Sequence, residues 1–378
     1  MRIGIDARLW NETGVGRYIR NLVWQLQKLD KKNTYILFVK KDSTKEELKI
    51  TSENFSLVET DIRWHTVDEQ LLFHKVIENE LLDLVHFPYF SVPILYNKPF
   101  VITIHDLIIN HFPTGKASTL PLPVYYAKRL AYNYILKQAA KKSQRVISVS
   151  EATKKEIIQH LKVPEKKITV TYEGFDLKLE KKETNSEQVG MLGLDKSKYF
   201  LYVGNAYPHK NVERLVEAFH LIFVEYPDVK LVLVGKNNYF SSQLEEKVNK
   251  LQLEKSIVFS GGVSDKELVS LYKHAEALIF PSLMEGFGLP GLEAMQSECL
   301  VLAADIPVFK EIYQDAAVYF NPRAVASIHA TIRQVLTEKK SFSQYIQKGK
   351  EQVKTFSWEK MAKETIHIYE SCVSLRQN

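Results

Sequence analysis

The sequence predicts an α/β protein built from two parallel-sheet domains. Three observations lead to this prediction. Short apolar runs alternate with longer amphipathic stretches, the alternation stops at a charged segment near the middle of the chain, and it then starts again. Strands that alternate with helices form parallel sheets covered by helices on both faces. A chain of 378 residues has room for two domains, since a domain usually holds roughly 100–200 residues.

We expect the first domain to span residues 1–176. Its expected strands are short apolar runs, and its expected helices are longer and amphipathic. The strands are Arg2–Asp6, Tyr35–Val39, Leu84–Phe87, Phe100–Ile104, Arg145–Val149 and Ile168–Tyr172. The helices are Gly16–Leu29, Val67–Leu82, Thr119–Lys142 and Glu151–Leu161. A sheet of this type binds ligands beyond the carboxyl ends of its strands.

The segment Gly174–Lys198 is charged and poor in apolar residues, which is typical of an interdomain linker. The second domain is expected to span residues 190–356. Its strands are Tyr199–Val203, Val229–Val234, Ile257–Phe259, Ala277–Phe280, Cys299–Ala303 and Ala317–Phe320. Its helices are Asn211–Tyr226, Ser242–Leu251, Asp265–His274, Gly288–Gln296 and Ala324–Thr337. We expect the final amphipathic stretch, 357–378, to pack back on the first domain.

The bulk composition narrows the possible partners and locations. A net charge of +6 suits anionic partners such as nucleotide phosphates or acidic lipid surfaces. A dense basic tail and a zinc-type Cys/His cluster are both absent, so we expect no nucleic-acid partner. The two cysteines, Cys299 and Cys372, lie far apart and suit a reducing cytoplasm. Neither a signal peptide nor an apolar run of about 18 residues is found, which predicts a cytoplasmic protein.

The strongest functional signal is the run Phe280–Met295. A strand ends near Pro281, a glycine-rich loop follows, and a helix begins near Leu289. Glycines let the backbone approach a ligand closely, and free N–H groups at a helix N-terminus favour phosphate or hydroxyl oxygens. Glu285 and Glu293 lie eight residues apart, so both carboxylates could accept hydrogen bonds from the hydroxyls of one ligand. The alternative interpretation is a helix cap beside a surface glutamate.

The second signal is the run Leu201–Asn211, in which a strand is followed by a turn, by Lys210 and by the start of a helix. A lysine beside a helix N-terminus makes a cationic pocket for a diphosphate. When a nucleoside diphosphate leaves a sugar, its negative charge grows, and a fixed cation stabilises that transition state more than the ground state. The alternative is a solvated surface lysine.

Two weaker signals lie in the first domain. The loop Thr13–Tyr18 contains two glycines but is no dinucleotide-binding loop, because Ile19 occupies the third glycine position. Arg17 in this loop is a candidate phosphate contact, and the alternative is a tight turn that opens a helix. His105 stands at the carboxyl end of a predicted strand, where ligand sites lie, although a lone histidine is more often structural.

These motifs together resemble those of the family 4 glycosyltransferases. The pattern of glutamate, seven residues and glutamate lies in a Glu-Gly-Phe-Gly-Leu-Pro frame. The other motifs follow the family's order: Gly-Val-Gly-Arg-Tyr, Thr-Ile-His-Asp, Val-Ser-Glu, Tyr-Val-Gly…His-Lys-Asn and Phe-Ser-Trp-Glu. The resemblance covers nearly the whole chain. It implies the GT-B fold, in which two Rossmann-like domains face each other across a cleft, and sugar transfer with retention of configuration.

The resemblance also implies roles for individual residues of the second domain. Glu285 would hold the hydroxyls of the donor sugar close to the bond that breaks, and Glu293 would bind the ribose. The backbone amides of Phe287, Gly288 and Leu289 would contact the donor sugar and its phosphates.

In the resembled family, the loop that contains Gly14, Gly16 and Arg17 closes over the donor phosphates and the acceptor. His105 would meet the transferred sugar. Val263 stands in a loop that borders the nucleotide base, where backbone contacts would do the recognising.

One position departs from the family pattern. Gly204, Asn205 and Lys210 would border the donor phosphates, but the family commonly has an arginine where Asn205 stands. The missing second cation weakens the expected diphosphate clamp. His209 or Arg17 could compensate for it.

The sequence therefore predicts a retaining hexosyltransferase whose donor substrate is a nucleotide-diphosphate sugar, with no further cofactor. An Asp-x-Asp pair is absent, so we expect catalysis without a metal ion. The motif forms favour GDP-mannose as the donor, while UDP-glucose, UDP-N-acetylglucosamine and dTDP-rhamnose stay open. The acceptor would be a glycan or a lipid-linked sugar of envelope or exopolysaccharide synthesis. Two alternatives are a sugar-nucleotide epimerase of the same architecture and a catalytically inactive subunit that binds nucleotide sugars.

The stretch Thr119–Arg145 raises the possibility of peripheral contact with an anionic membrane. It holds six basic residues and no acidic ones, with tyrosines between them. A basic, aromatic helix can lie on an anionic bilayer. The alternative is an ordinary amphipathic helix that covers the sheet and exposes its basic residues to water.

Overall fold

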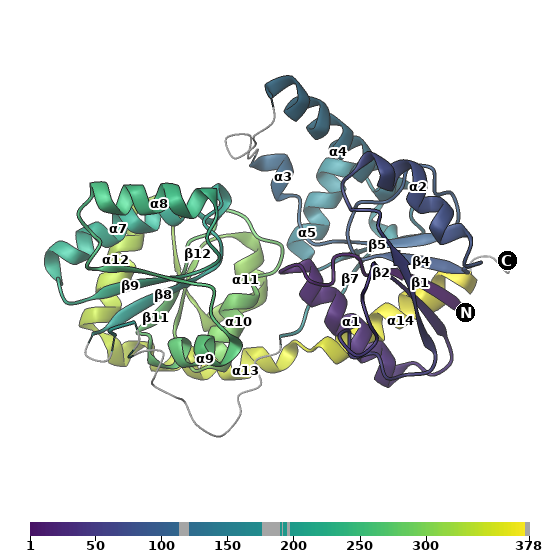
Figure 1. Ribbon diagram of the computed structural model, residues 1–378. Coiled ribbons are helices and arrows are strands. Elements are labelled where there is room, and N and C mark those ends of the chain that lie inside the picture. The colour runs from purple at the N-terminus through teal and green to yellow at the C-terminus, as the bar shows by residue number, and fades with distance from the viewer. Residues whose placement is uncertain (113–120, 176–189, 191, 195–196, 375–378) are drawn as a thin grey trace. The chain divides into compact units, whose positions relative to one another are not determined.

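The computed structural model describes residues 1–378 except 113–120, 176–189, 191, 195–196 and 375–378. The chain divides into two compact units (Figure 1). The first comprises Met1–Leu107, Leu120–Gly174 and Ser357–Asn378, and the second comprises Ile108–Thr119 and Phe175–Phe356. Each unit holds one all-parallel sheet flanked by helices. The prediction of two parallel-sheet α/β domains is therefore confirmed.

The first unit contains a seven-stranded sheet with the order β3-β2-β1-β4-β5-β6-β7. All of its neighbouring strands pair in parallel. The strands are β1 (Arg2–Asp6), β2 (Thr34–Lys40), β3 (Phe55–Thr60), β4 (Leu84–Phe87), β5 (Phe100–Ile104), β6 (Arg145–Ser148) and β7 (Ile168–Val170). β4 and β5 are buried along their whole length. This burial explains their nearly continuous apolar sequences.

The helices of this part of the chain are α1 (Val15–Leu29), α2 (Val67–Glu78), α3 (Ile108–His111), α4 (Leu122–Lys142), α5 (Glu151–Glu156) and the C-terminal α14 (Trp358–Ser374). α14 packs against α1 and β4 (Figure 1). Tyr369 anchors it through its hydroxyl, which lies 2.6 Å from Nδ1 of the fully buried His86. The last helix of the chain thus completes the core of the first unit.

The second unit contains a six-stranded parallel sheet with the order β10-β9-β8-β11-β12-β13. Its strands are β8 (Tyr199–Val203), β9 (Lys230–Val234), β10 (Ile257–Gly261), β11 (Ala277–Phe280), β12 (Val301–Ala304) and β13 (Val318–Phe320). Its helices are α7 (Val212–Glu225), α8 (Tyr239–Lys250), α9 (Asp265–His274), α10 (Leu289–Gln296), α11 (Pro307–Tyr313), α12 (Val325–Thr337) and α13 (Ser343–Gln352). Parallel strands place all their carboxyl ends at one edge of a sheet, which is where the predicted site residues lie in both units.

Four of the strands and α-helices named above were not predicted: β3, α3, α11 and α13. β3 is an edge strand whose exposed positions carry polar residues, so it lacks the apolar run of the inner strands. α11 and α13 are short, and α13 buries little of its surface. The prediction for α8 began three residues too late, because the side chain of Asn238 caps the helix at Phe240 and Ser241. Most of the predicted linker lies outside the described residues.

Candidate active site

The two strongest sequence signals meet in the second unit. Nζ of Lys210 lies 2.6 Å from Oε1 of Glu285, although the two residues are 75 positions apart. Their side chains are 17% and 9% exposed, so the pair is largely shielded from solvent but still accessible. Lys210 also lies 5.7 Å from the ring centre of Phe280 at the end of β11. Lys210 and Glu285, which the sequence predicted to contact the diphosphate and the donor sugar, therefore lie side by side in the fold.

The backbone explains why these two loops meet. The amide of Leu283 donates to the carbonyl of His209 over 2.7 Å. Asn211 follows Lys210 with φ 59°, a left-handed conformation that asparagine tolerates better than most residues. Its side-chain amide donates to the carbonyls of Pro281 and Pro322 at 3.0 and 2.8 Å. Asn211 thus fixes the start of α7 against the loop that carries Glu285.

The second glutamate lies inside α10 and is buried. Glu293 is 3% exposed and accepts a hydrogen bond of 3.2 Å from the hydroxyl of Tyr272. Because a carboxylate has two oxygens and several lone pairs, this bond leaves capacity for a further donor. The ribose-binding role of Glu293 stays a prediction.

The glycines of the Glu285 loop are required by Tyr313, which the sequence interpretation missed. Gly288 has φ 107°, and a Cβ there would lie 2.3 Å from the hydroxyl oxygen of Tyr313. A Cβ on Gly291 would lie 2.3 Å from the ring of the same tyrosine. The Tyr313 hydroxyl donates to the carbonyl of Gly288. Tyr313 therefore packs against the segment Phe287–Leu289, whose backbone amides were predicted to contact the donor. No local sequence motif marks Tyr313.

A pocket lies at the carboxyl ends of β8, β9 and β10. Its lining includes Tyr202, Gly204, Gly235, Lys236 and Gly261. The loops are packed tightly, since a Cβ on Gly235 would lie 2.1 Å from the carbonyl oxygen of Gly204. The exposed Lys236 was missed by the sequence interpretation, although the Val-Gly-Lys strand end was a usable signal.

Two further predicted residues adjoin this pocket. Asn205 follows Gly204, its carbonyl accepts from the Tyr202 hydroxyl at 2.6 Å, and its side chain accepts weakly from the amide of Tyr207 at 3.4 Å. Val263 is half-buried, two positions beyond Gly261, in the loop between β10 and α9. No side-chain cation occupies position 205.

The structure does not favour His209 as the missing cation. Burial and the charge of Lys210 lower the pKa of His209 to about 4, so its ring is neutral at pH 7. Its Nδ1 atom and Oγ of the neighbouring Ser282 are both buried, with no hydrogen-bond partner among the described residues. Buried polar atoms without partners are rare, and these two flank the Lys210–Glu285 pair in sequence.

In the first unit, the glycine loop opens α1 as expected. Gly14 is the N-terminal cap and has φ 54°. Gly16 cannot carry a side chain, because a Cβ would lie 2.6 Å from the carbonyl oxygen of Leu9. Arg17 is half-buried on the first turn of the helix. The Tyr18 hydroxyl lies 3.2 Å from Oγ1 of Thr103 on β5.

His105 follows β5 and is enclosed by protein groups. Its Nδ1 lies 3.0 Å from Oε1 of Glu173, and its Nε2 lies 3.1 Å from the carbonyl oxygen of Pro88. The ring of Tyr18 stands edge-on to it at 4.9 Å. Burial lowers the pKa of His105, but the hydrogen bond and the charge of Glu173 outweigh burial and hold the pKa above its ordinary value. The two weaker sequence signals, the glycine loop and His105, therefore meet through the ring of Tyr18.

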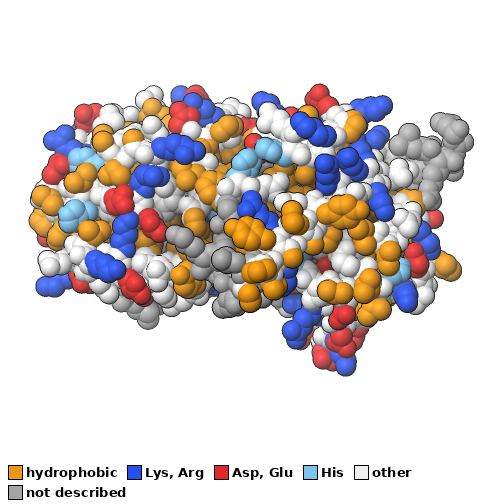
Figure 2. All heavy atoms as spheres, turned by 90° about the horizontal axis from the view of Figure 1, so that it is seen from above, with side chains coloured by type: hydrophobic (Ala, Val, Ile, Leu, Met, Phe, Trp, Pro, Cys, Tyr) orange, Lys and Arg blue, Asp and Glu red, His pale blue; other side chains and the backbone are white. Residues whose placement is uncertain are grey.

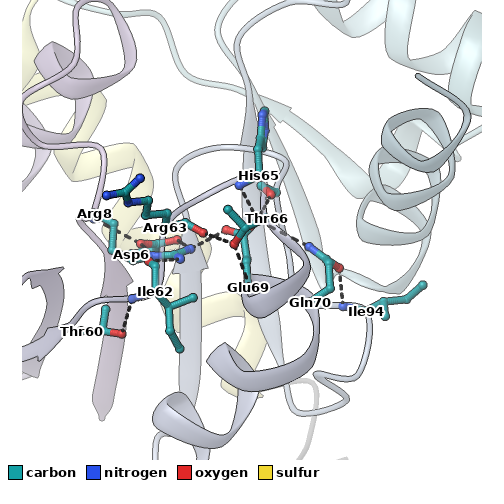
Figure 3. A network of polar contacts seen from close by, with 11 residues as sticks. Asp6, Arg8, Thr60, Ile62, Arg63, His65, Thr66, Glu69, Gln70 and Ile94 are labelled. Atoms are coloured by element: carbon teal, nitrogen blue, oxygen red, sulfur yellow. Dashed lines mark hydrogen bonds and ion pairs between the residues drawn. The ribbon is translucent and has the colours of Figure 1, made fainter. Parts of the chain in front are cut away.

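A buried ion network lies nearby, at the carboxyl end of β1 (Figure 3). Arg8, with a side chain 2% exposed, pairs with Asp6 at 2.7 Å and with the fully buried Glu69 at 2.6 Å. Glu69 also accepts from the backbone amide of His65 at 2.9 Å. Arg8 further donates to the carbonyl of Ile62. The network anchors the loop between β3 and α2. Within it, the charge of Arg8 is balanced by Asp6 and Glu69.

Comparison with known proteins agrees with this geometry. Residues 13–179 match the model of Glycosyltransferase Family 4, and residues 185–352 match that of the Glycosyl transferases group 1. The O-antigen chain mannosyltransferase RfbU of Salmonella typhimurium is 29% identical over 72% of this chain and 70% of that protein. The O-antigen chain mannosyltransferase B of Escherichia coli is also 29% identical, over 76% of this chain and 74% of that protein.

The fold is shared with solved structures of the same kind. HepE of Anabaena, crystallised with UDP-glucose, matches 98% of this chain and 100% of that chain with a TM-score of 0.77 and 18% identity. The two parallel-sheet units and the loops at their carboxyl edges define the chain as a glycosyltransferase with the GT-B fold. It belongs to the family 4 glycosyltransferases, with a family 4 domain followed by a group 1 domain. Among the described residues, no helix is long and apolar enough to cross a bilayer.

Proposed function

We propose that this protein transfers a hexose with retention of configuration from a nucleotide-diphosphate sugar to a glycan or lipid-linked acceptor. The observation that carries the proposal is the Lys210–Glu285 pair, which joins a phosphate-type cation to a hydroxyl-binding carboxylate over 2.6 Å. An ammonium has three N–H donors, so Lys210 keeps donors for a diphosphate while it contacts Glu285. Glu285 has a second oxygen for a sugar hydroxyl.

The proposed step breaks the bond between the anomeric carbon of the donor and its phosphate oxygen. The acceptor hydroxyl oxygen bonds to the same face of that carbon, and its proton passes to the leaving phosphate oxygen. Lys210 and the backbone amides of the Phe287–Leu289 segment stabilise the charge that grows on the diphosphate. We propose that these groups do so without a metal ion. Glu293 binds the ribose, and Tyr313 holds the loop in place from below.

We propose GDP-mannose as the donor. Two relatives are mannosyltransferases of O-antigen chains, which supports both a mannosyl donor and an acceptor of envelope polysaccharide synthesis. The structural neighbour HepE was crystallised with UDP-glucose, so UDP sugars are the main competitors. The lining of the pocket at β8–β10 includes the polar side chains of Tyr202, Lys236, Asn237 and Ser241 beside three glycines, and its residue types alone do not select one base.

The test is thermal unfolding with GDP, UDP, dTDP and their sugars, followed by assays of transfer and donor hydrolysis. A ligand at 100 times its dissociation constant stabilises the folded state by about 2.7 kcal/mol. We expect the largest shift with GDP species and its loss in Lys210→Ala. The matched control is Lys247→Ala, which removes a half-buried lysine of α8 that pairs with Glu217. A shift with UDP or dTDP species alone would overturn the mannose assignment and leave the reaction class intact.

A second candidate is a subunit that binds nucleotide sugars without turnover. The observation in its favour is the incomplete cation set, because Asn205 is neutral and the pKa of His209 is lowered to about 4. The same experiment separates the candidates. Transfer or donor hydrolysis means a transferase, binding without turnover means an inactive subunit, and an isomerised donor means an epimerase.

We further propose that α4 contacts the inner face of an anionic membrane, where a lipid-linked acceptor would be found, and that the enzyme is otherwise cytoplasmic. Tyr126, Leu130 and Tyr134 form one row of the helix and are 56%, 71% and 54% exposed. Lys137 and Lys141, both exposed, continue the row by helical spacing. Figure 2 shows hydrophobic side chains beside Lys and Arg side chains on the face viewed from above. This combination suits the interface of an anionic bilayer.

Co-sedimentation with vesicles tests this surface. We expect binding to phosphatidylglycerol vesicles, weaker binding to phosphatidylcholine vesicles, and strong loss of binding in Leu130→Glu. The control is Val224→Glu, which adds the same charge at an exposed apolar position of α7. Equal binding of the two variants, or no preference for anionic lipid, would assign α4 an ordinary solvent-facing role.

A further inference from the structure

The hydrogen bonds of His105 restrict its protonation state. Its Nδ1 faces the Glu173 side chain at 3.0 Å, and its Nε2 faces the Pro88 carbonyl at 3.1 Å. A carboxylate and a peptide carbonyl are both acceptors. Only an imidazolium, which carries a proton on each ring nitrogen, donates to both. A neutral ring would leave one nitrogen and one acceptor facing each other without a proton between them.

The other groups around His105 come from several elements, and they differ in the direction of their effect. Glu173 follows β7 and Asp106 follows β5, and both negative charges raise the pKa of His105. His86 on β4 is neutral, because burial lowers its pKa to about 3. Tyr18 on α1 contributes a ring edge, and burial keeps its hydroxyl protonated. The acidic neighbours therefore favour the charged ring.

We propose that Glu173 is a positioning residue that keeps His105 a doubly hydrogen-bonded imidazolium at the carboxyl end of β5. This inference rests on the proposed function only in expecting His105 to act in sugar transfer. In this state His105 neither accepts a proton nor has a free ring N–H for a sugar hydroxyl. It acts through its fixed positive charge and through the shape of its ring.

This assignment changes the role expected from the sequence, in which His105 meets the transferred sugar. A general base needs an unprotonated nitrogen within reach of the acceptor hydroxyl. Both nitrogens are already used within the first unit. Glu173 lies 68 positions from His105 in the sequence. The contact that defines its role exists only in the folded chain.

The first experiment measures the ring nitrogens of ¹⁵N-labelled histidines by NMR across pH, with the signals of His105 assigned by their loss in His105→Gln. In the wild type we expect both nitrogens of His105 to stay protonated at pH 7. In Glu173→Gln, we expect the titration of His105 to move down by about one pH unit or more, because the carboxylate charge is lost. Glu173→Asp keeps a carboxylate and should restore part of the shift.

The second readout is the pH profile of kcat for sugar transfer. If the imidazolium is the active form, activity falls as pH rises through its pKa, and Glu173→Gln should move this fall to lower pH with little change in KM. The matched control is Glu225→Gln, because Glu225 faces His329 across 2.8 Å in a similar but exposed pair. We expect that variant to leave the profile unchanged.

The outcomes separate this inference from the proposed function. A neutral His105 in wild-type protein at pH 7, or an unchanged titration in a folded Glu173→Gln variant, would overturn the inference whatever the activity. Absence of nucleotide-sugar binding and turnover would instead overturn the proposed function, since the NMR measurement needs neither. If Glu173→Gln does not fold, the same criterion is applied to Glu173→Asp. A His105 titration that is unchanged from wild type in that variant would overturn the inference.

Discussion

Each unit has a cation–carboxylate pair at the carboxyl edge of its sheet, and the two pairs differ in the hydrogen-bond donors that they leave available. In the second unit, Lys210 meets Glu285 at the edge of the sheet, with side chains 17% and 9% exposed. In the first unit, His105 meets Glu173, with side chains 12% and 9% exposed. Burial and distance are similar. The chemistry of the two cations is what separates them.

An ammonium keeps unused donors after it forms one ion pair, whereas the imidazolium of His105 uses both of its donors within the protein. The flexible lysine side chain can also turn toward a new partner, but the ring of His105 is fixed at both nitrogens. The Lys210 pair is therefore suited to bind a ligand, and the His105 pair is suited to hold a charge in place. The Arg8 network of the first unit leaves the least charge available for a ligand, because Arg8 pairs with two carboxylates of the protein itself, Asp6 and Glu69.

The largest expected effect is a loss of unfolding free energy when the buried Arg8–Glu69 pair is broken. Glu69→Gln leaves the buried Arg8 with only Asp6 as a charged partner, and breaking a buried pair in this way costs about 3–5 kcal/mol. Chemical denaturation of both proteins measures the loss. The control is Glu80→Gln, which removes a partly exposed pair with Arg2 and should cost no more than about 1 kcal/mol. Equal costs would mean that burial does not distinguish these pairs.

Loss of the ligand-binding cation comes next. Lys210→Ala should lower kcat by about 100-fold or more, or roughly 3 kcal/mol, on the scale seen when one transition-state charge contact is removed. We expect little loss of folding stability, since Lys210 is partly exposed and Glu285 keeps access to water. Steady-state kinetics and thermal unfolding measure the two effects. A large loss of stability with unchanged kcat would assign the pair a structural role.

A smaller loss of stability is expected when the uncharged contact between Tyr369 and His86 is removed. Tyr369→Phe removes the hydroxyl that lies 2.6 Å from Nδ1 of His86, and it leaves a buried ring nitrogen without its partner. The expected cost is about 1–3 kcal/mol of unfolding free energy. Tyr126→Phe, at an exposed position of α4, is the matched control and should change little. A Tyr369→Phe variant as stable as the control would show that α14 is held by packing alone.

The smallest expected effect is the dependence of stability on pH. The folded pKa of His105 is raised, so its contribution is fully present below the unfolded pKa of about 6.5 and is lost as pH rises through the folded pKa. Glu173→Gln should therefore lose more stability, relative to wild type, at pH 6 than at pH 9. Urea denaturation at the two pH values measures this difference. A difference that is larger at pH 9 would contradict the assigned charge state.

Some corrections show where sequence reasoning reached its limit. The motif around Lys210 suggested His209 as a possible second cation. Burial makes that ring neutral, and burial of a particular side chain cannot be read from a motif. Gly204 and Gly288 were expected to border a ligand. In the fold each also approaches a tyrosine ring or hydroxyl, and that constraint applies without any ligand.

The sequence by itself determined the two parallel-sheet units, the order of most strands and helices, the glycosyltransferase family and the loops that carry the site. These features depend on local periodicity and on motifs of adjacent residues, which a linear chain displays directly. Only the tertiary structure decided that Lys210 contacts Glu285, that Tyr313 supports Gly288 and that Glu173 holds His105. These pairs are separated by 75, 25 and 68 positions. The charge of a buried ring and the partner of a buried carboxylate follow from which segments the sheet brings together, and no local pattern contains that information.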